Sequence, residues 1–172
     1  MLRTKFSEIA KIITGVLETH FEQPTLVRHV RNSSNLNVLA SLYSTTISSQ
    51  ALDCLSIALA AQDASTWALP ITQSILKKVT AVSMDPRPKV RKSAQDAATS
   101  LLRNPKCASV AATVVGTFCL HASKQLDLAD SQKVVHFVHL LKDYMPFLQS
   151  QASTFPALAF SSFFPFLLLL AP

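Results

Sequence analysis

The chain has 172 residues, of which 49% are hydrophobic, 15% are charged and two are glycine, and its formal net charge is +6. This length and apolar content suffice for a sizeable core and argue against a disordered chain. The two glycines argue against phosphate-cradling loops and a dinucleotide fingerprint, and they favour helices over hairpins. The three cysteines lack a CxxC spacing, which argues against a disulfide framework and indicates buried thiols of a reducing compartment.

The first predicted elements are an amphipathic helix and a less regular segment. Apolar residues recur at helical spacing across residues 5–20. Pro24 then opens a shorter segment, residues 25–31. Residues 32–50 are rich in Ser, Thr and Asn, and we expect an irregular insertion there. The apolar pattern returns at Ala51 and predicts a helix of small residues that ends near Gln62.

Prolines divide the next part of the chain into two helices. Pro70 fits the first turn of a helix that reaches Ser83, because the missing N–H of proline costs nothing at that position. The sequence Asp85-Pro-Arg-Pro ends this helix and begins another, from about Arg87 to Arg103. Two amphipathic helices joined by so short a turn are expected to pack antiparallel.

The same alternation of helices and short breaks continues toward the C-terminus. Asn104-Pro105 precedes a helix that reaches about Lys124, and Asp130 can cap a further helix with apolar positions as far as Leu148. Helix starts about twenty residues apart make a pair about every forty residues, which is the length of a HEAT unit. One pair cannot bury its apolar stripe alone. Residues 1–149 are therefore predicted to form an all-α, HEAT/armadillo-like superhelix of stacked antiparallel helix pairs.

An uncharged, hydrophobic tail follows at residues 150–172, and we expect it to lie outside the repeat fold. A membrane anchor is the alternative, but a span needs about 20 apolar residues. Serines and prolines interrupt a shorter run here, so membrane association is ranked below an appended tail. Charged residues near the start, such as Lys5 and Glu8, also argue against a secretory signal.

The excess positive charge is concentrated in residues 77–106, which hold eight basic residues against two acids, Asp85 and Asp96. Such a surface is typical of proteins that bind a phosphate backbone or an acidic partner. A solvated charged face of a helix pair is the alternative. The candidate residues for binding RNA or an acidic partner are Lys77, Lys78, Arg87, Lys89, Lys92, Arg103 and Lys106.

The sequence shows no pattern typical of catalysis or of a cofactor. His136 and His139 lie three residues apart on one predicted helix, but two ligands without a partner at a clear spacing are too few for a metal site. No nucleophile motif occurs. We therefore expect no enzyme, no cofactor and no metal, and we expect Trp67 and Phe118 to be core anchors rather than base-stacking platforms.

The turn sequence Asp85-Pro-Arg-Pro-Lys-Val-Arg-Lys-Ser-Ala-Gln95 resembles the HEAT signature. That resemblance implies that Asp85 and Arg91 pair in a ladder between repeats. Four ordered segments also resemble the N-terminal repeats of the ribosomal RNA-processing protein 12 family. They are TKFSEIAKIITGVLETH, the run from QDASTWALP to TSLLRN, CASVAATVVGTFCLHAS and VHLLKDYMPFL. Together they cover roughly residues 4–31 and 51–149.

Members of that family are large, non-catalytic helical-repeat scaffolds of the nucleus and nucleolus, which join small-subunit precursors and take part in pre-ribosomal RNA maturation and ribosome export. The resemblance therefore implies a scaffold whose partners are pre-ribosomal RNA and ribosome assembly proteins. The alternative is a generic HEAT-repeat adaptor that binds only proteins, for example in transport or trafficking. A tail-anchored membrane protein is ranked below both.

Overall fold

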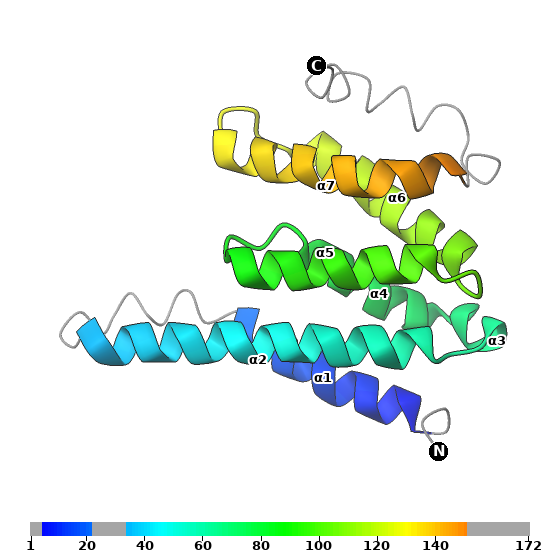
Figure 1. Cartoon of the computed structure of the whole chain (residues 1–172), viewed down its shortest axis with the longest axis horizontal. Coiled ribbons are helices and arrows are strands. Elements are labelled where there is room, and N and C mark those ends of the chain that lie inside the picture. The colour runs from blue at the N-terminus through cyan, green and yellow to red at the C-terminus, as the bar shows by residue number, and fades with distance from the viewer. Residues whose placement is uncertain (1–4, 22–33, 151–172) are drawn as a thin grey trace.

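The computed structural model describes residues 5–21 and 34–150, and every regular element in these ranges is a helix. The helices follow one another up a stack from the N-terminal to the C-terminal end (Figure 1). They are α1 (Phe6–Phe21), α2 (Ser34–Ala60), α3 (Ala64–Trp67), α4 (Pro70–Val82), α5 (Pro88–Arg103), α6 (Ala108–Gln125) and α7 (Ser131–Ser150). The predicted all-α fold is confirmed.

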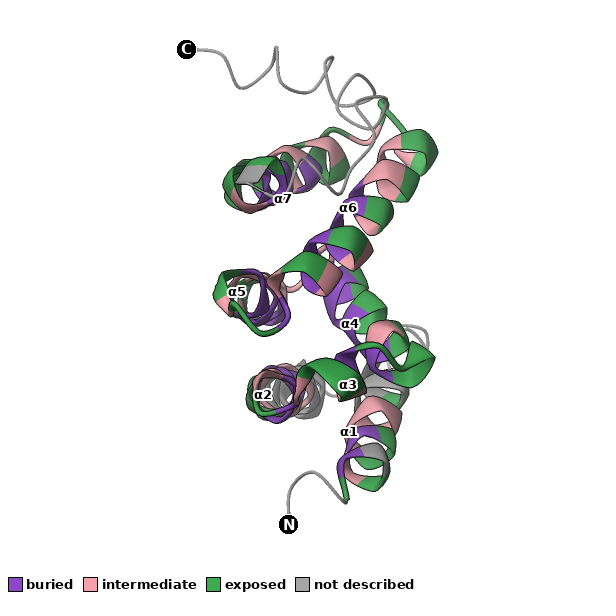
Figure 2. Ribbon diagram, turned by 90° about the vertical axis from the view of Figure 1, so that its right-hand side faces the viewer, coloured by how far each residue is buried: buried purple, intermediate pink, exposed green. Residues whose placement is uncertain are grey.

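The helices other than the short α3 form two layers, which Figure 2 shows side by side. One layer, named here the α4 layer, contains α1, α4 and α6. The other, named the α5 layer, contains α2, α5 and α7. Within each layer, neighbouring helices are in contact, and α1–α2, α4–α5 and α6–α7 form pairs across the two layers. This is the stacked-pair architecture of a HEAT-like superhelix.

The helix boundaries follow the predicted prolines and caps. Pro70 and Pro88 occupy the first turns of α4 and α5. The side chain of Asn104 accepts a hydrogen bond from the Lys106 backbone N–H at 3.1 Å, in the turn between α5 and α6. At the start of α7 the Asp130 carboxylate accepts from the Lys133 N–H, also at 3.1 Å. These local signals cut the chain into elements of the right length to pair.

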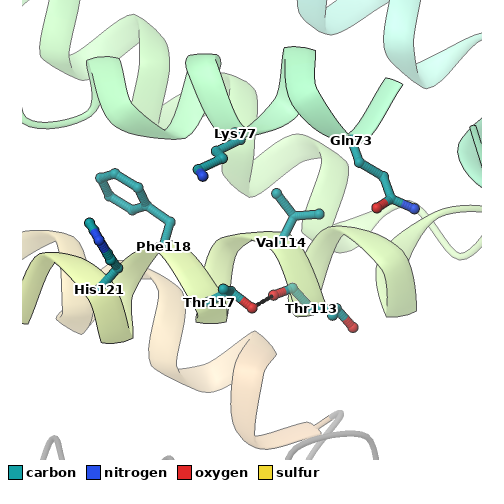
Figure 3. A pocket seen from close by; sticks show the side chains of 7 residues that line it. All are labelled: Gln73, Lys77, Thr113, Val114, Thr117, Phe118 and His121. Carbon is teal, nitrogen blue, oxygen red and sulfur yellow. Dashed lines mark hydrogen bonds between the residues drawn. The ribbon is translucent and has the colours of Figure 1, made fainter. Parts of the chain in front are cut away.

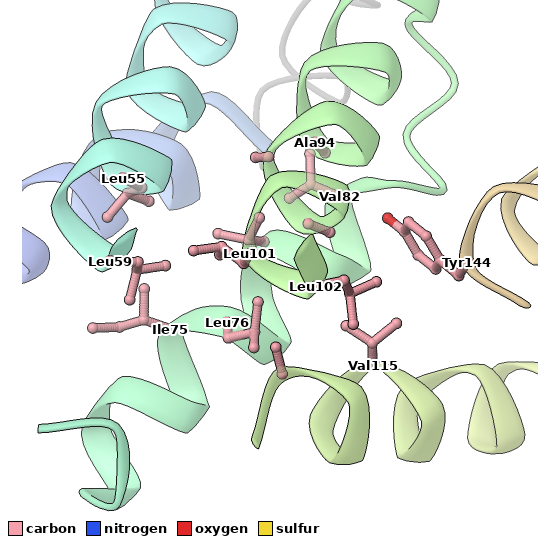
Figure 4. Packing of buried hydrophobic residues seen from close by; sticks show 14 of the residues in the cluster. Leu55, Leu59, Ile75, Leu76, Val82, Ala94, Leu101, Leu102, Val115 and Tyr144 are labelled. Atoms are coloured by element: carbon pink, nitrogen blue, oxygen red, sulfur yellow. The ribbon is translucent and has the colours of Figure 1, made fainter. Parts of the chain in front are cut away.

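The core lies between the two layers and is drawn in Figure 4. Leu59, Leu76, Leu101 and Val115 come from four different helices and are all 0% exposed. Each helix therefore contributes its apolar stripe to one continuous cluster. Burial of such side chains stabilises each by about 1.5–3 kcal/mol relative to exposure. Tyr144 closes the cluster from α7 and has a buried polar contact of its own.

The Tyr144 hydroxyl lies 2.9 Å from the Ser83 hydroxyl, so the two form a buried hydrogen bond between α7 and the end of α4. Burial is the main reason why the pKa of Tyr144 is raised well above its ordinary value, while the bond to Ser83 opposes this shift. The phenol therefore stays neutral and acts as a structural contact. A bond of this kind satisfies polar groups that would otherwise be costly to bury.

The structure differs from the expected irregular insertion at residues 32–50, because α2 is one continuous helix from Ser34 to Ala60. Serine and threonine are weak helix formers, but tertiary packing can override propensity. Ser48 and Ser49 are buried, and the Ser49 hydroxyl lies 2.7 Å from the Ser93 hydroxyl of α5. Small side chains thus let α2 lie close along α5. The sequence pattern of α2 alone does not indicate this packing.

The short helix α3 was not predicted from the pattern. Asp63 caps it, accepting hydrogen bonds from the Thr66 N–H at 3.0 Å and from the Ser65 hydroxyl at 2.7 Å. Trp67 ends the helix and is only 1% exposed, which confirms its prediction as a core anchor. Phe118 is half-buried and packs against the same core cluster.

The cysteines divide between the core and the surface. Cys107 and Cys119 are buried as predicted, and their burial raises the pKa of Cys107 to about 11 and that of Cys119 to about 12. Cys54 of α2 is exposed, so the prediction of a buried thiol is wrong there. It shares the solvent-facing side of α2 with Ile57, three residues further along the helix.

Two parts of the predicted chain lie outside the described residues: the segment at 25–31 and the hydrophobic tail from residue 151. The helices that are described include none with the length and apolar character needed to cross a membrane.

Candidate functional site

The structure divides the predicted basic residues between the two layers. Lys77 and Lys78 lie on α4, whereas Lys89, Lys92 and Arg103 lie on α5. The remaining two occupy turns, Arg87 before α5 and Lys106 after it. The excess positive charge is therefore continuous in sequence but divided between the two layers and the turns that join them.

Three of the four basic residues of α5 share one face of that helix. Lys89, Lys92 and Arg103 are separated by three and eleven residues, which places them within one stripe at 3.6 residues per turn. All three are exposed, and Asp96 and Ser100 complete the stripe between them. The buried side chains on the opposite side of α5 are all apolar. We name these three cations the α5 stripe.

The contacts within the α5 stripe leave its charges available to a ligand. Lys92 Nζ lies 3.7 Å from an Asp96 carboxylate oxygen, but both side chains are more than 60% exposed. Exposed pairs of this kind contribute about 0–1 kcal/mol, so Lys92 can exchange partners at little cost. The Arg103 guanidinium lies 5.3 Å from the centre of the Phe147 ring of α7. This cation–π contact holds Arg103 in place while the side chain stays exposed.

Arg87 has a structural role in the turn between α4 and α5. Its Nε and Nη2 atoms each donate to a different oxygen of Asp85 at 2.9 Å, and its backbone N–H donates to the same carboxylate at 2.8 Å. A further bond of 3.1 Å reaches the Ser44 hydroxyl of α2. Asp85 is buried, so this bidentate pair fixes the turn and the neighbouring repeat together.

The expected ladder contact between Asp85 and Arg91 takes a different form. Arg91 donates to the backbone carbonyl of Asp85 at 2.9 Å and to that of Pro86 at 3.3 Å, while the Asp85 carboxylate pairs with Arg87. The difference arises because Arg87 sits two residues after Asp85, where its fork reaches both carboxylate oxygens. Arg91 therefore stabilises the same turn by hydrogen bonds to backbone carbonyl groups.

Arg91 also acts on a histidine of α7. Partial burial, followed by the nearby positive charges of Arg91 and His139, lowers the pKa of His136, and Asp130 opposes this shift. The positive charge of Arg91 near His136 disfavours a metal cation at this position. The described residues contain no group of three or more His, Cys, Asp or Glu side chains that could hold a metal ion.

Comparison of the three helices in the α5 layer singles out α5. The range of α2 contains one acid, Asp53, and no lysine or arginine. Helix α7 has two exposed lysines: Lys133, whose Nζ lies 3.1 Å from an Asp130 carboxylate oxygen, and Lys142, which is followed directly by Asp143. Helix α5 carries four basic residues against one acid. Sequence reasoning missed Lys142 because it lies outside residues 77–106, and only the alternation of helices between layers brings α7 next to α5.

Comparisons with known proteins match most of the chain. The family described as "RRP12-like, N-terminal HEAT repeats" matches residues 9–160. The matched range includes residues 32–50 and continues past the end of α7. The human protein named "RRP12-like protein" is 26% identical over 151 residues, which cover 80% of this chain. Those residues amount to 12% of the human protein's length. No solved structure matches.

Proposed function

The chain belongs to the RRP12-like family and contains its N-terminal HEAT repeats, and from this premise we propose that it is a non-catalytic scaffold of ribosome biogenesis. In this proposal the α5 stripe binds pre-ribosomal RNA, and the stacked helices present further surface to ribosome assembly proteins. The associated roles are pre-ribosomal RNA processing and the maturation and export of the small subunit. The expected location is the nucleus, and the nucleolus within it.

The observation that carries the RNA proposal is the α5 stripe itself. Three exposed cations lie along one helix in the middle of a layer, on the side opposite the buried stripe. A row of this kind can neutralise successive phosphates and release their counterions. Such binding is strong at low salt and largely indifferent to base sequence, so specificity would come from other parts of the assembly.

The test measures RNA affinity of the full chain by fluorescence anisotropy, with a labelled fragment of pre-ribosomal RNA at low salt. The triple variant Lys89→Glu, Lys92→Glu, Arg103→Glu is expected to bind at least about tenfold more weakly, because it reverses the charges that would meet phosphate. Its helical circular dichroism signal should stay that of the wild type, since all three side chains are exposed.

A matched control carries the same change of charge on the α4 layer: Lys11→Glu, Lys77→Glu, Lys124→Glu. These three lysines are also exposed. The control is expected to keep most of the affinity. Equal losses in the two triple variants would mean that binding follows net charge and not the α5 stripe. An unchanged affinity in the α5 variant would reject RNA binding at this site and favour an adaptor that binds only proteins.

A further inference from the structure

A groove of about 290 Å³ lies between α4 and α6, in the other layer from the α5 stripe. Gln73 and Lys77 line it from α4, and the remaining lining residues come from α6. Figure 3 shows the Lys77 side chain extending from α4 toward α6, where Val114 and Phe118 lie. The groove is thus formed between two successive repeats and not within one helix pair.

The α6 side of this groove is mainly apolar. Val114 and Phe118 are half-buried and pack against the core, which holds them in position. The Thr117 hydroxyl donates to the Thr113 carbonyl at 2.7 Å, and the Thr113 hydroxyl donates to the Ser109 carbonyl at 3.0 Å. Because these hydrogens are used within α6, the wall offers mainly methyl groups and an aromatic ring to a ligand.

Within α4 and α6, the two helices that form the groove, every aspartate, glutamate, lysine or arginine position is a lysine. The ranges of α4 and α6 contain no aspartate or glutamate, but they contain Lys77, Lys78 and Lys124. Lys77 and Lys124 are exposed, and His121 lines the groove three residues before Lys124. The acid that follows α4, Asp85, is bound to Arg87. An approaching ligand therefore meets an apolar floor with a positive rim.

We propose that the α4–α6 groove docks an acidic linear segment of a partner protein, which inserts one aliphatic or aromatic side chain against Phe118 and pairs its carboxylates with Lys77 and Lys124. Its volume lies just below the roughly 300–1,000 Å³ typical of small-molecule pockets, which suits a single anchoring side chain. Charge complementarity selects the flanking residues. RNA fits less well, because only one lysine lines the groove and backbone binding needs several.

The experiment selects ligands for the full chain from a phage-displayed library of random dodecapeptides. Enriched peptides are expected to carry aspartate or glutamate around a leucine, phenylalanine or tryptophan. A synthetic, fluorescein-labelled copy of the most enriched peptide is then titrated by anisotropy. Lys77→Glu and Thr117→Glu are each expected to weaken its binding at least about tenfold, since both place a negative charge where the carboxylates would lie. Both positions are exposed, so the fold should survive.

The control is the α5-layer variant Lys89→Glu, Lys92→Glu, which should bind the peptide as the wild type does. Neutral or basic enriched peptides, or no enrichment, would overturn the proposal, as would undiminished binding by Lys77→Glu and Thr117→Glu. Loss of RNA binding in those two variants without loss of peptide binding would assign the groove to RNA instead. The proposed RNA contact of the α5 stripe stands or fails separately, because it uses different residues on the other layer.

Discussion

The two layers of the stack have lysines on their surfaces but differ in what surrounds them. On α5 the cations form a stripe along a single helix, with an acid and a serine between them. In the α4 layer, Lys77 lines a groove whose α6 wall is mainly aromatic and aliphatic. A row of charges on one rod suits an extended polyanion. A positive rim around an apolar floor suits a short segment with both acidic and apolar groups.

Under the two proposals, this difference would let one helical-repeat protein separate two kinds of ligand while using one kind of charged residue. Successive helices alternate between layers, so Lys78 and Lys89 lie in different layers although only ten residues separate them in the chain. A net charge counted along the sequence therefore combines residues of the two layers. Charges are better counted separately for each layer, because each layer is built from every second helix.

The largest effect is expected from a change that disrupts both layers at once. Leu101 of α5 is fully buried in the core cluster, which also holds residues of α2, α4 and α6 (Figure 4). Leu101→Ala should lower the free energy of unfolding by about 2–5 kcal/mol, through lost burial and the cavity left behind. Urea denaturation followed by circular dichroism measures this. The exposed neighbour Ser100→Ala is the control, and equal midpoints for the two variants would contradict the core assignment.

A smaller loss of stability is expected from a change in the turn between α4 and α5, which connects the two layers. Asp85→Ala removes the bidentate partner of Arg87 and the acceptor of its backbone N–H. Leaving those donors unsatisfied should cost about 1–3 kcal/mol of stability. Asp96→Ala removes only an exposed pair with Lys92 and should cost much less. Denaturation of both variants compares them directly, and equal losses would refute the structural role of Asp85.

The smallest perturbation is a chemical label that distinguishes an exposed thiol from thiols in the core without unfolding the protein. Cys54 of α2 is exposed, whereas Cys107 and Cys119 lie in the core with pKa values raised to about 11 and about 12. Thiolate is the reactive form, so at pH 8 one thiol per native chain should react quickly with Ellman's reagent, and three should react in urea. Cys54→Ser should abolish the fast phase. Persistence of the fast phase would show that Cys107 or Cys119 is not buried.

Most helices were predictable because local signals act at their ends. Pro70 and Pro88 each open a helix, and the apolar stripe of α5 is strong enough to orient it. The first half of α2 was not predictable, since serines and threonines carry neither amphipathic periodicity nor high helix propensity. Its helical state depends on lying along α5, where Ser49 meets Ser93. That contact joins residues 44 positions apart in the chain.

The candidate site was predictable only in part for the same reason. The spacing of Lys89, Lys92 and Arg103 already places them on one face. The position of Lys77 in the other layer depends on how the pairs stack. The choice of Arg87 over Arg91 as partner of Asp85 depends on turn geometry. The groove between α4 and α6 has no sequence signal, because its two walls come from different repeats.

The helix pairs contact chiefly their immediate neighbours, and a stack of this kind can bend elastically. Small tilts at each junction can add up to a change of curvature without breaking any one contact surface. The α5 stripe lies on a single helix, so its charges keep their spacing when the curvature of the stack changes. The α4–α6 groove straddles a junction, so it widens or narrows with the curvature. A change of curvature would therefore alter the proposed peptide site more than the proposed RNA site.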